Sequence, residues 1–139
     1  MTKNEMPTGA RRFGYFLSIV INFGLLYVAN NLLNWNINFL TADFSKVLWV
    51  INLSFSVTIF THFIFLFFDR KWFKNLMQAL ENVFAFISGF IFRQVFPLDV
   101  SSSLARLINI GLIILLVIIL ISILSELISA IKHYQKTNY

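Results

Sequence analysis

Two ionisable side chains of this sequence could together do proton chemistry. His62 lies in a long uncharged apolar stretch, and Glu81 lies in the next apolar stretch along the chain. Histidine titrates near physiological pH, so a carboxylate that packs beside it could exchange protons with it. Arg93 follows Glu81 in the same stretch, where it would guard one end of a polar path. Such a path requires the two stretches to pack against each other.

Uncharged polar side chains interrupt the same apolar stretches. A polar group in an apolar environment is costly, so each one is a functional candidate until its role is explained. The simpler role is structural, because Asn, Ser and Thr side chains hydrogen-bond neighbouring helices together. We favour this role and keep the path as the alternative. The candidates for a polar path or for helix contacts are Asn22, Asn52, Thr58, His62, Glu81, Ser88 and Arg93.

The elements that must position these residues are long apolar helices. Hydrophobic residues make up 58% of the 139 residues and charged residues 12%, a balance outside that of soluble domains. A helix that crosses the hydrocarbon of a membrane needs about 20 apolar residues, and four such helices with short connections use nearly the whole length. Polar tails are expected at 1–10 and 132–139. The predicted spans are 13–33, 47–68, 76–96 and 104–131.

Most Lys and Arg residues gather in clusters that predict the topology. Two apolar stretches separate each cluster from the next. Cytoplasmic segments of membrane proteins are enriched in Lys and Arg, so the clusters predict that both termini lie inside. The expected fold is an all-α integral membrane protein, a compact bundle of four transmembrane helices with N-in/C-in topology. The clusters are Lys3, Arg11 and Arg12, then Arg70, Lys71 and Lys74, and finally Lys132 and Lys136.

The direction of each predicted helix converts sequence position into depth, at about 1.5 Å per residue. Polar residues then fall into two layers with a few between them. The inner layer holds His62, Glu81, Asn82 and Glu126. The outer layer holds Asn30, Asn31, Asn52, Arg93, Arg106 and Asn109, and Asn22, Ser56, Thr58 and Ser88 lie between the layers. A path would need the middle group to join the two layers on one interior face.

Charged and small residues around the third span form two further candidate groups. Arg93 and Arg106 flank Asp99 in the sequence, which predicts an outer charge cluster in which Arg93 neutralises Asp99 or meets lipid headgroups. Ala85 and Gly89 are two small residues one helical turn apart. This spacing lets another backbone approach closely, so we expect close helix packing there.

Several residues are expected to begin or end the predicted helices. Thr41 or Asp43 would cap the second helix by accepting hydrogen bonds from its free N–H groups, with Lys46 beside Asp43. Pro97 would end the third helix, because proline cannot continue the hydrogen-bond ladder. One of the serines at 101–103 would cap the fourth helix.

The sequence lacks the residue sets typical of an active site. It has 2 His and no Cys, and its acidic residues lie mostly at helix ends. A zinc site, a cysteine nucleophile and a phosphate-binding glycine loop each need residues that are missing or scattered. Topology and anionic lipid explain the net charge of +5 more simply than nucleic acid does. We expect no enzymatic activity, and therefore no catalytic residues, metal or cofactor.

The first half of the chain resembles GtrA-type membrane proteins. The resemblance consists of the Arg-Phe pair at 12–13 and the Asp-Arg-Lys-Trp-Phe run at 69–73, which follows the second predicted helix. It covers less than half of the chain, and the second half has no matching basic-aromatic run. The family has four spans at about this length, and the resemblance implies a role in handling polyprenyl-linked sugars.

The sequence favours a small non-enzymatic membrane protein that acts as an oligomeric or accessory subunit of a membrane complex. Four helices enclose little interior volume, so one copy alone would make a cramped transporter. The alternative is a small channel or transporter for ions, protons or a small solute, and a further alternative is a lipid-linked-substrate protein. The expected partners are membrane lipids and either further copies or a larger complex. The expected location is the cell membrane, with a bacterial inner membrane as the default.

Overall fold

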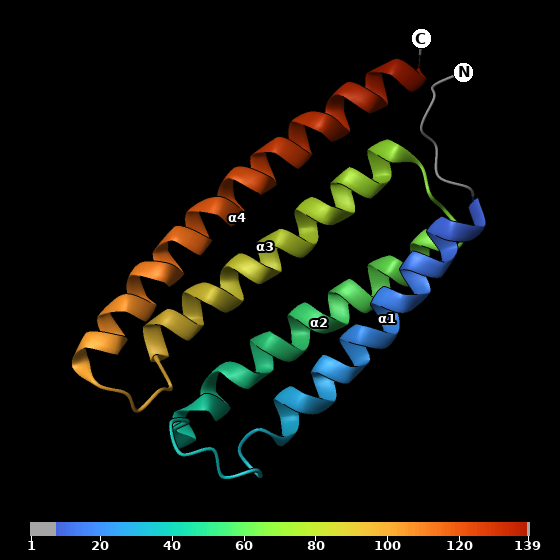
Figure 1. The fold of residues 1–139 in the computed structure, drawn as a ribbon. Helices are drawn as coiled ribbons and strands as arrows, with labels where there is room; N and C mark the ends of the chain where they lie inside the picture. Colours follow the sequence, from blue (N-terminus) through green and yellow to red (C-terminus); the bar gives the residue numbers. More distant parts are fainter. Residues whose placement is uncertain (1–7, 139) are drawn as a thin grey trace.

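The computed structural model describes residues 8–138, which form four long α-helices and one short 3₁₀ helix. A single isolated bridge, between Leu40 and Leu98, is the only strand-like pairing in this range. The prediction of an all-helical fold is therefore confirmed (Figure 1). The elements are α1 (Thr8–Asn31), the 3₁₀ helix η1 (Ala42–Phe44), α2 (Ser45–Phe65), α3 (Lys71–Val95) and α4 (Ser102–Thr137).

Each of the four α-helices is long and apolar enough to cross a membrane. Large apolar side chains stay exposed along their surfaces, among them Leu107 and Ile121, which are 66% and 60% exposed. Exposure on this scale is unfavourable in water and favourable in hydrocarbon. The helices therefore indicate a multi-pass membrane protein.

The helices form an open row rather than the expected compact bundle. Helix α1 packs on α2, α2 on α3, and α3 on α4, so extensive contacts join only neighbours in sequence. Helices α4 and α1 consequently lie at the two edges of the row (Figure 1). In lipid, apolar side chains gain nothing from leaving the solvent, so no hydrophobic force closes the row. Each edge helix keeps one side free.

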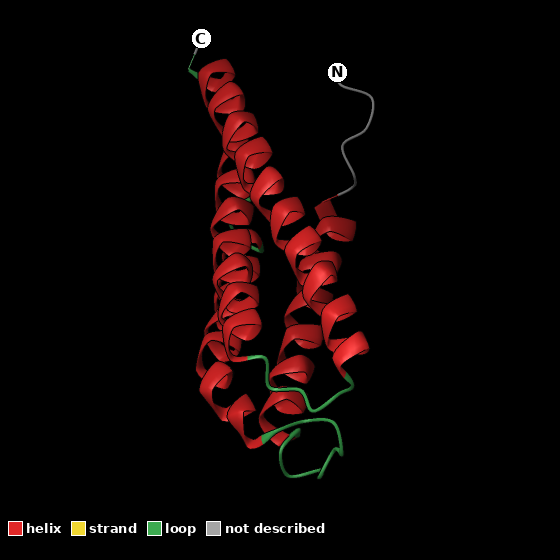
Figure 2. Cartoon of the chain, turned by 90° about the vertical axis from the view of Figure 1, so that its left-hand side faces the viewer, coloured by secondary structure: helices red, strands yellow, loops and turns green. Residues whose placement is uncertain are grey.

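The helix ends gather at two ends of the molecule. The start of α1, the connection 66–70 and the end of α4 lie together, and we call this the basic end because it carries Arg11, Arg12, Arg70, Lys71, Lys74, Lys132 and Lys136. The loops at 32–41 and 96–101 lie at the other end, which we call the opposite end (Figure 2). The three predicted clusters thus share one end of the fold, except for Lys3, which lies outside the described residues.

Three helices extend further than hydropathy alone predicts. Helix α1 begins at Thr8 rather than at 13, within the predicted polar tail at 1–10, and α3 begins at Lys71 rather than at 76. Helix α4 continues to Thr137, so most of the predicted polar tail at 132–139 is helical. The 36 residues of α4 span about 54 Å, well beyond the thickness of hydrocarbon. Residues such as Glu, Gln and Lys are good helix formers, and they prolong the backbone ladder after the apolar run has ended. Helix α4 is therefore longer than one crossing of hydrocarbon requires.

The predicted end of α3 and the predicted serine cap at the start of α4 are confirmed. Helix α3 stops at Val95, and Phe96 adopts a left-handed backbone conformation with φ 44° just before Pro97. Ser101 caps α4, because its hydroxyl oxygen accepts a hydrogen bond from the Leu104 N–H at 3.4 Å. These signals are local in sequence, which is why they could be read before the structure.

The predicted cap of α2 is wrong. Neither Thr41 nor Asp43 accepts a capping bond through its side chain, because η1 leads directly into the first turn of α2. Asp43 instead lies 2.7 Å from the Lys46 ammonium, as the sequence suggested. This ion pair is exposed and contributes little to stability.

Backbone hydrogen bonds join the two loops at the opposite end. The Thr41 N–H donates to the Pro97 carbonyl at 3.0 Å, and the Asp99 N–H donates to the Phe39 carbonyl at 2.8 Å. Pro97 is fully buried between the loops. We call these four residues the clasp. The clasp ties the hairpin α1–α2 to the hairpin α3–α4.

Candidate functional site

The structure brings His62 and Glu81 together. Helices α2 and α3 pack side by side, and His62 Nδ1 lies 3.4 Å from Glu81 Oε1. Both side chains are about five-sixths buried, with 17% and 16% of their surfaces exposed. The condition set by the sequence, that the second and third helices must pack for these two residues to meet, is therefore fulfilled.

The histidine ring is held by its own helix. His62 Nδ1 lies 2.9 Å from the carbonyl oxygen of Thr58, one turn earlier. A carbonyl oxygen only accepts, so this contact requires a proton on Nδ1. The neutral ring then leaves Nε2 free to accept a second proton. The carboxylate of Glu81 lies on the Nδ1 side, where it stabilises the doubly protonated ring.

Thr61 connects Glu81 to the same carbonyl. Its hydroxyl is buried, donates to Glu81 Oε1 and lies 3.1 Å from the Thr58 carbonyl oxygen. A hydroxyl has one proton, so it serves one of these acceptors at a time. With Glu81 ionised, Thr61 donates to the carboxylate. With Glu81 protonated, the acid donates to Thr61 and Thr61 donates to Thr58, so the group is hydrogen-bonded in either state.

A second polar group stands next to this one and ties α1 to the α2–α3 connection. The Tyr15 hydroxyl donates to Asp69 Oδ1 at 2.7 Å, and Arg11 Nη1 lies 3.0 Å from Asp69 Oδ2. Both oxygens of the carboxylate therefore have a partner. The Lys74 ammonium lies over the Tyr15 ring, 5.1 Å from its centroid. Charges of both signs thus converge on one buried tyrosine.

Aromatic rings separate the two groups. The Tyr15 ring lies 6.0 Å from the His62 ring and 5.3 Å from the Phe65 ring, centroid to centroid. Phe65 is fully buried and also contacts His62. We call the whole arrangement the inner polar cluster, which consists of Arg11, Tyr15, Thr61, His62, Asp69 and Glu81. It joins α1, α2 and α3 near the basic end.

Four of the six residues of this cluster were not among the predicted candidates. They are Arg11, Tyr15, Thr61 and Asp69. Tyr15 follows Arg11 by one helical turn and shares its face, and Asp69 is the only acid beside the middle basic cluster. The sequence therefore offered one signal for the pairing of Arg11 with Asp69, namely that the acidic side chain is expected at the same depth as the basic one.

The other inter-helix polar contacts hold pairs of helices together. Asn30 and Asn52 exchange amide hydrogen bonds of 2.8 and 3.1 Å between α1 and α2. The Ser88 hydroxyl of α3 lies 3.2 Å from the Val50 carbonyl of α2 and 2.9 Å from the carbonyl of its own preceding turn. The structure thus places the predicted candidates Asn52 and Ser88 in helix contacts.

Helices α3 and α4 are joined through Asn82 and Glu126. The Asn82 amide lies 2.9 and 2.8 Å from the two carboxylate oxygens of Glu126. Depth alone placed both residues in the inner layer. Asn22 behaves differently, because its amide donates to the Ser18 carbonyl of its own helix at 2.8 Å. Asn22 is therefore satisfied within α1.

One of the two small residues of α3 marks a close helix contact. A side chain at Gly89 would place its Cβ 3.0 Å from a methyl carbon of Leu116, so Gly89 is where α4 approaches closely. Ala85, one turn earlier, is partly buried. The expected close packing therefore occurs at Gly89.

The residues of the predicted outer charge cluster do not pair with one another. Within residues 8–138, no ion pair joins Arg93 or Arg106 to Asp99. Asp99 and Arg106 are exposed, and Arg93 is partly buried. The Arg93 Nε is fully buried and has no hydrogen-bond partner. The neutralisation of Arg93 by Asp99 is therefore absent from this structure.

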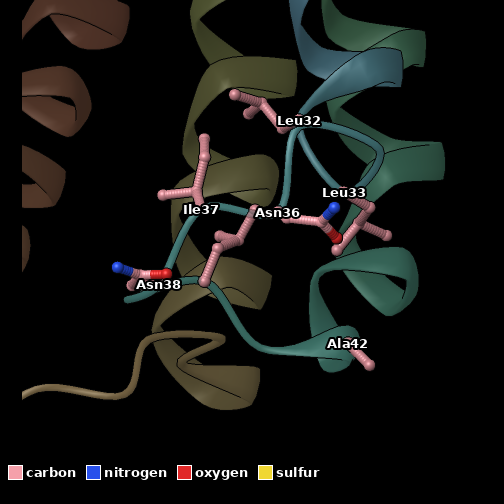
Figure 3. Close-up of a pocket in the computed structure, with 7 residues that line it drawn as sticks. Leu32, Leu33, Asn36, Ile37, Asn38 and Ala42 are labelled. Carbon is pink, nitrogen blue, oxygen red and sulfur yellow. The ribbon is translucent and has the colours of Figure 1, made fainter.

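A hollow of about 470 Å³ lies in the first loop, away from the inner polar cluster (Figure 3). Asn36 bends the loop there with φ 49°. The lining offers amide groups and apolar side chains but no titratable group. Its residues are Leu32, Leu33, Asn36, Ile37, Asn38, Leu40 and Ala42. It adds no chemistry to the site.

Within the described residues, no group of three or more His, Asp or Glu side chains is placed to bind a metal ion. Comparison of the chain with protein-family models, with curated proteins and with solved structures finds no match. The resemblance to GtrA-type proteins consequently has no support beyond the two short runs that suggested it.

Proposed function

We propose that this chain is a small non-enzymatic membrane protein that acts as an oligomeric or accessory subunit. The open row of helices carries the proposal, because α1 and α4 each pack on one neighbour and keep one side free. The polar residues support it, since Asn30, Asn52, Ser88 and Asn82 are used in bonds between helices. Each free edge offers a surface on which a helix of another copy or of a partner protein can pack.

The free side of α1 contains a glycine with open space around it. A Cβ at Gly24 would meet no atom within 4 Å. A glycine inside a helix costs about 1 kcal/mol relative to alanine, and no atom of residues 8–138 fills the space that it leaves. Close approach of a second helix is the common use of such a glycine in membranes. We infer that the α1 edge receives the α4 edge of a neighbouring copy.

The level of that contact can be worked out from the bonds between helices. Three hydrogen-bonded pairs show which residues of neighbouring helices lie at the same depth. The pairs are Asn30 with Asn52, Thr61 with Glu81, and Asn82 with Glu126. Counting along each helix from these pairs places Gly24 level with Leu124. Leu124 is 56% exposed on the surface of α4. In a ring or row of copies that share one orientation, the two residues would therefore meet.

Cysteine cross-linking in membranes tests the contact cleanly, because the chain has no cysteine. We expect the double variant Gly24→Cys, Leu124→Cys to form a ladder of disulfide-linked copies under mild oxidation. The matched control is Gly24→Cys with Leu107→Cys, whose second cysteine lies about 25 Å further along α4. The control should stay largely monomeric on non-reducing gels.

Native mass spectrometry of the purified wild type separates the two forms of the proposal. A homo-oligomer that agrees with the cross-links supports assembly from identical copies. A single copy that retains a different membrane protein supports an accessory role. A stable monomer without partners and without specific cross-links would contradict both.

A small proton channel or transporter is the second candidate, and the inner polar cluster favours it. Thr61 can keep Glu81 hydrogen-bonded whether the acid is protonated or ionised, so a proton can enter or leave without a buried polar group losing its partner. We expect protein in liposomes to give a proton flux that His62→Ala and Glu81→Gln each reduce about tenfold or more. A flux that equals that of empty liposomes, or one that both variants leave unchanged, would contradict this candidate.

We further propose that the basic end faces the cytoplasm of a bacterial inner membrane, since Lys and Arg mark the cytoplasmic side. A role with lipid-linked substrates would call for a bilayer-facing groove near this end. The groove between α3 and α4 lies towards the opposite end, beside Arg93. The geometry therefore favours the other two candidates.

A further inference from the structure

An apolar groove of about 260 Å³ runs between α3 and α4. Its exposed lining is apolar, and one cationic residue stands at its outer part. The lining residues are Phe86, Phe90, Arg93, Ile113, Leu116, Val117 and Leu120. The groove lies on a surface that faces hydrocarbon if α3 and α4 span the membrane. Its apolar lining suits a hydrocarbon chain.

Arg93 lacks the anion that its position calls for. Its Nε is buried without a hydrogen-bond partner, and no carboxylate of the described residues pairs with its guanidinium. The guanidinium stays charged in proteins, so it cannot escape the cost of burial by losing a proton. Arg93 lies two residues before the end of α3, about 3 Å along the axis. If α3 crosses the membrane, this end of the helix lies near the level of the lipid phosphates.

Arg106 adds a second cation at the same end of the groove. It lies on the same stripe of α4 as Ile113 and Val117, further towards the opposite end, and it too has no ion pair within residues 8–138. Asp99, the acid nearest in sequence, is exposed and pairs with neither arginine. The outer end of the groove thus carries an excess of positive charge.

We propose that this groove binds an anionic phospholipid, with one acyl chain along α3 and α4 and the phosphate held by Arg93 and attracted by Arg106. Charge complementarity at the outer end and an apolar lining below it match the two parts of such a lipid. Arginine is suited to phosphate, because its fork donates two parallel hydrogen bonds. The site rests on an observation separate from the proposed assembly, although Leu124 lies on the same stripe of α4 as Val117 and Leu120, so the groove and the proposed contact occupy neighbouring levels of one face.

Lipid retention measured by native mass spectrometry tests the site. The full chain is purified in detergent, mixed with phosphatidylglycerol or with phosphatidylcholine, and the bound lipid is counted after the detergent is removed. We expect the wild type to keep one phosphatidylglycerol about tenfold better than phosphatidylcholine. Arg93→Ala should abolish this preference, and Arg93→Lys should keep part of it because the charge remains without the fork.

Two further variants separate the groove from general surface charge. Val117→Trp fills the groove and should lower the retention of both lipids, whereas Arg12→Ala removes an exposed cation at the basic end and should change neither. Circular dichroism confirms that each variant remains helical. Equal retention of the two lipids by the wild type would overturn the proposal. Retention of phosphatidylglycerol that survives both Arg93→Ala and Val117→Trp would overturn it as well.

Discussion

Asp69→Ala is expected to lower the free energy of unfolding by about 2 to 3 kcal/mol, one of the largest effects of any single polar substitution in this chain. The carboxylate accepts from the Tyr15 hydroxyl at 2.7 Å and pairs with Arg11 at 3.0 Å. Alanine leaves a buried hydroxyl and a partly buried guanidinium without partners. Tryptophan fluorescence during unfolding by sodium dodecyl sulfate in mixed micelles measures the loss.

Two matched variants divide this effect into its parts. Asp69→Asn keeps an oxygen for the Tyr15 hydroxyl but loses the charge that Arg11 pairs with, so we expect a cost of about 1 kcal/mol. Asp99→Asn changes an exposed acid whose side chain has no ion pair in the described residues, so it should stay within about 0.5 kcal/mol of the wild type. An Asp69→Ala effect as small as that of Asp99→Asn would contradict the role given to the carboxylate.

Gly89→Leu is expected to destabilise the protein by about 2 kcal/mol through overpacking between α3 and α4. A Cβ at this position already lies 3.0 Å from a Leu116 methyl carbon, and the rest of a leucine side chain would push α4 away. The separation would also stretch the bonds between Asn82 and Glu126. The same unfolding assay measures the change.

The control and the rescue make this prediction specific. Gly14 has open space around it, so Gly14→Leu should be neutral or gain up to about 1 kcal/mol from helix propensity. Adding Leu116→Ala to Gly89→Leu should restore much of the lost stability, although Leu116→Ala alone creates a cavity and destabilises the protein. Additive costs in the double variant would show that the two residues do not compete for the same space.

The features that the sequence predicted correctly are those that depend on neighbouring residues. The length and apolar character of the four helices, the end of α3 before Pro97 and the serine cap of α4 are all local. The meeting of His62 and Glu81 was also foreseen, because it needed only that consecutive helices pack as a hairpin. The extension of α4 to Thr137 was missed, since hydropathy marks the end of the apolar run and not of the backbone ladder.

The missed features depend on how each helix is rotated about its axis. Asn82 and Gly89 face α4, whereas Glu81 and Ser88, each one position earlier, contact α2. A step of one residue turns a side chain by about 100°, so small differences in helix rotation decide which partner it reaches. Composition cannot supply that rotation. The pairing of Asn82 with Glu126 was out of reach for the same reason.

The clasp limits how the two hairpins can move. At the basic end they are joined covalently through the connection 66–70, and at the opposite end by the backbone bonds of Thr41 and Asp99. A pair of hairpins fixed at both ends resists splaying apart, and its softest motion is a twist of one hairpin against the other about the α2–α3 contact. Main-chain atoms form these bonds, so the restraint tolerates most changes of side chain at the same positions. Side chains of the clasp can therefore change while the backbone contact between the two hairpins is kept.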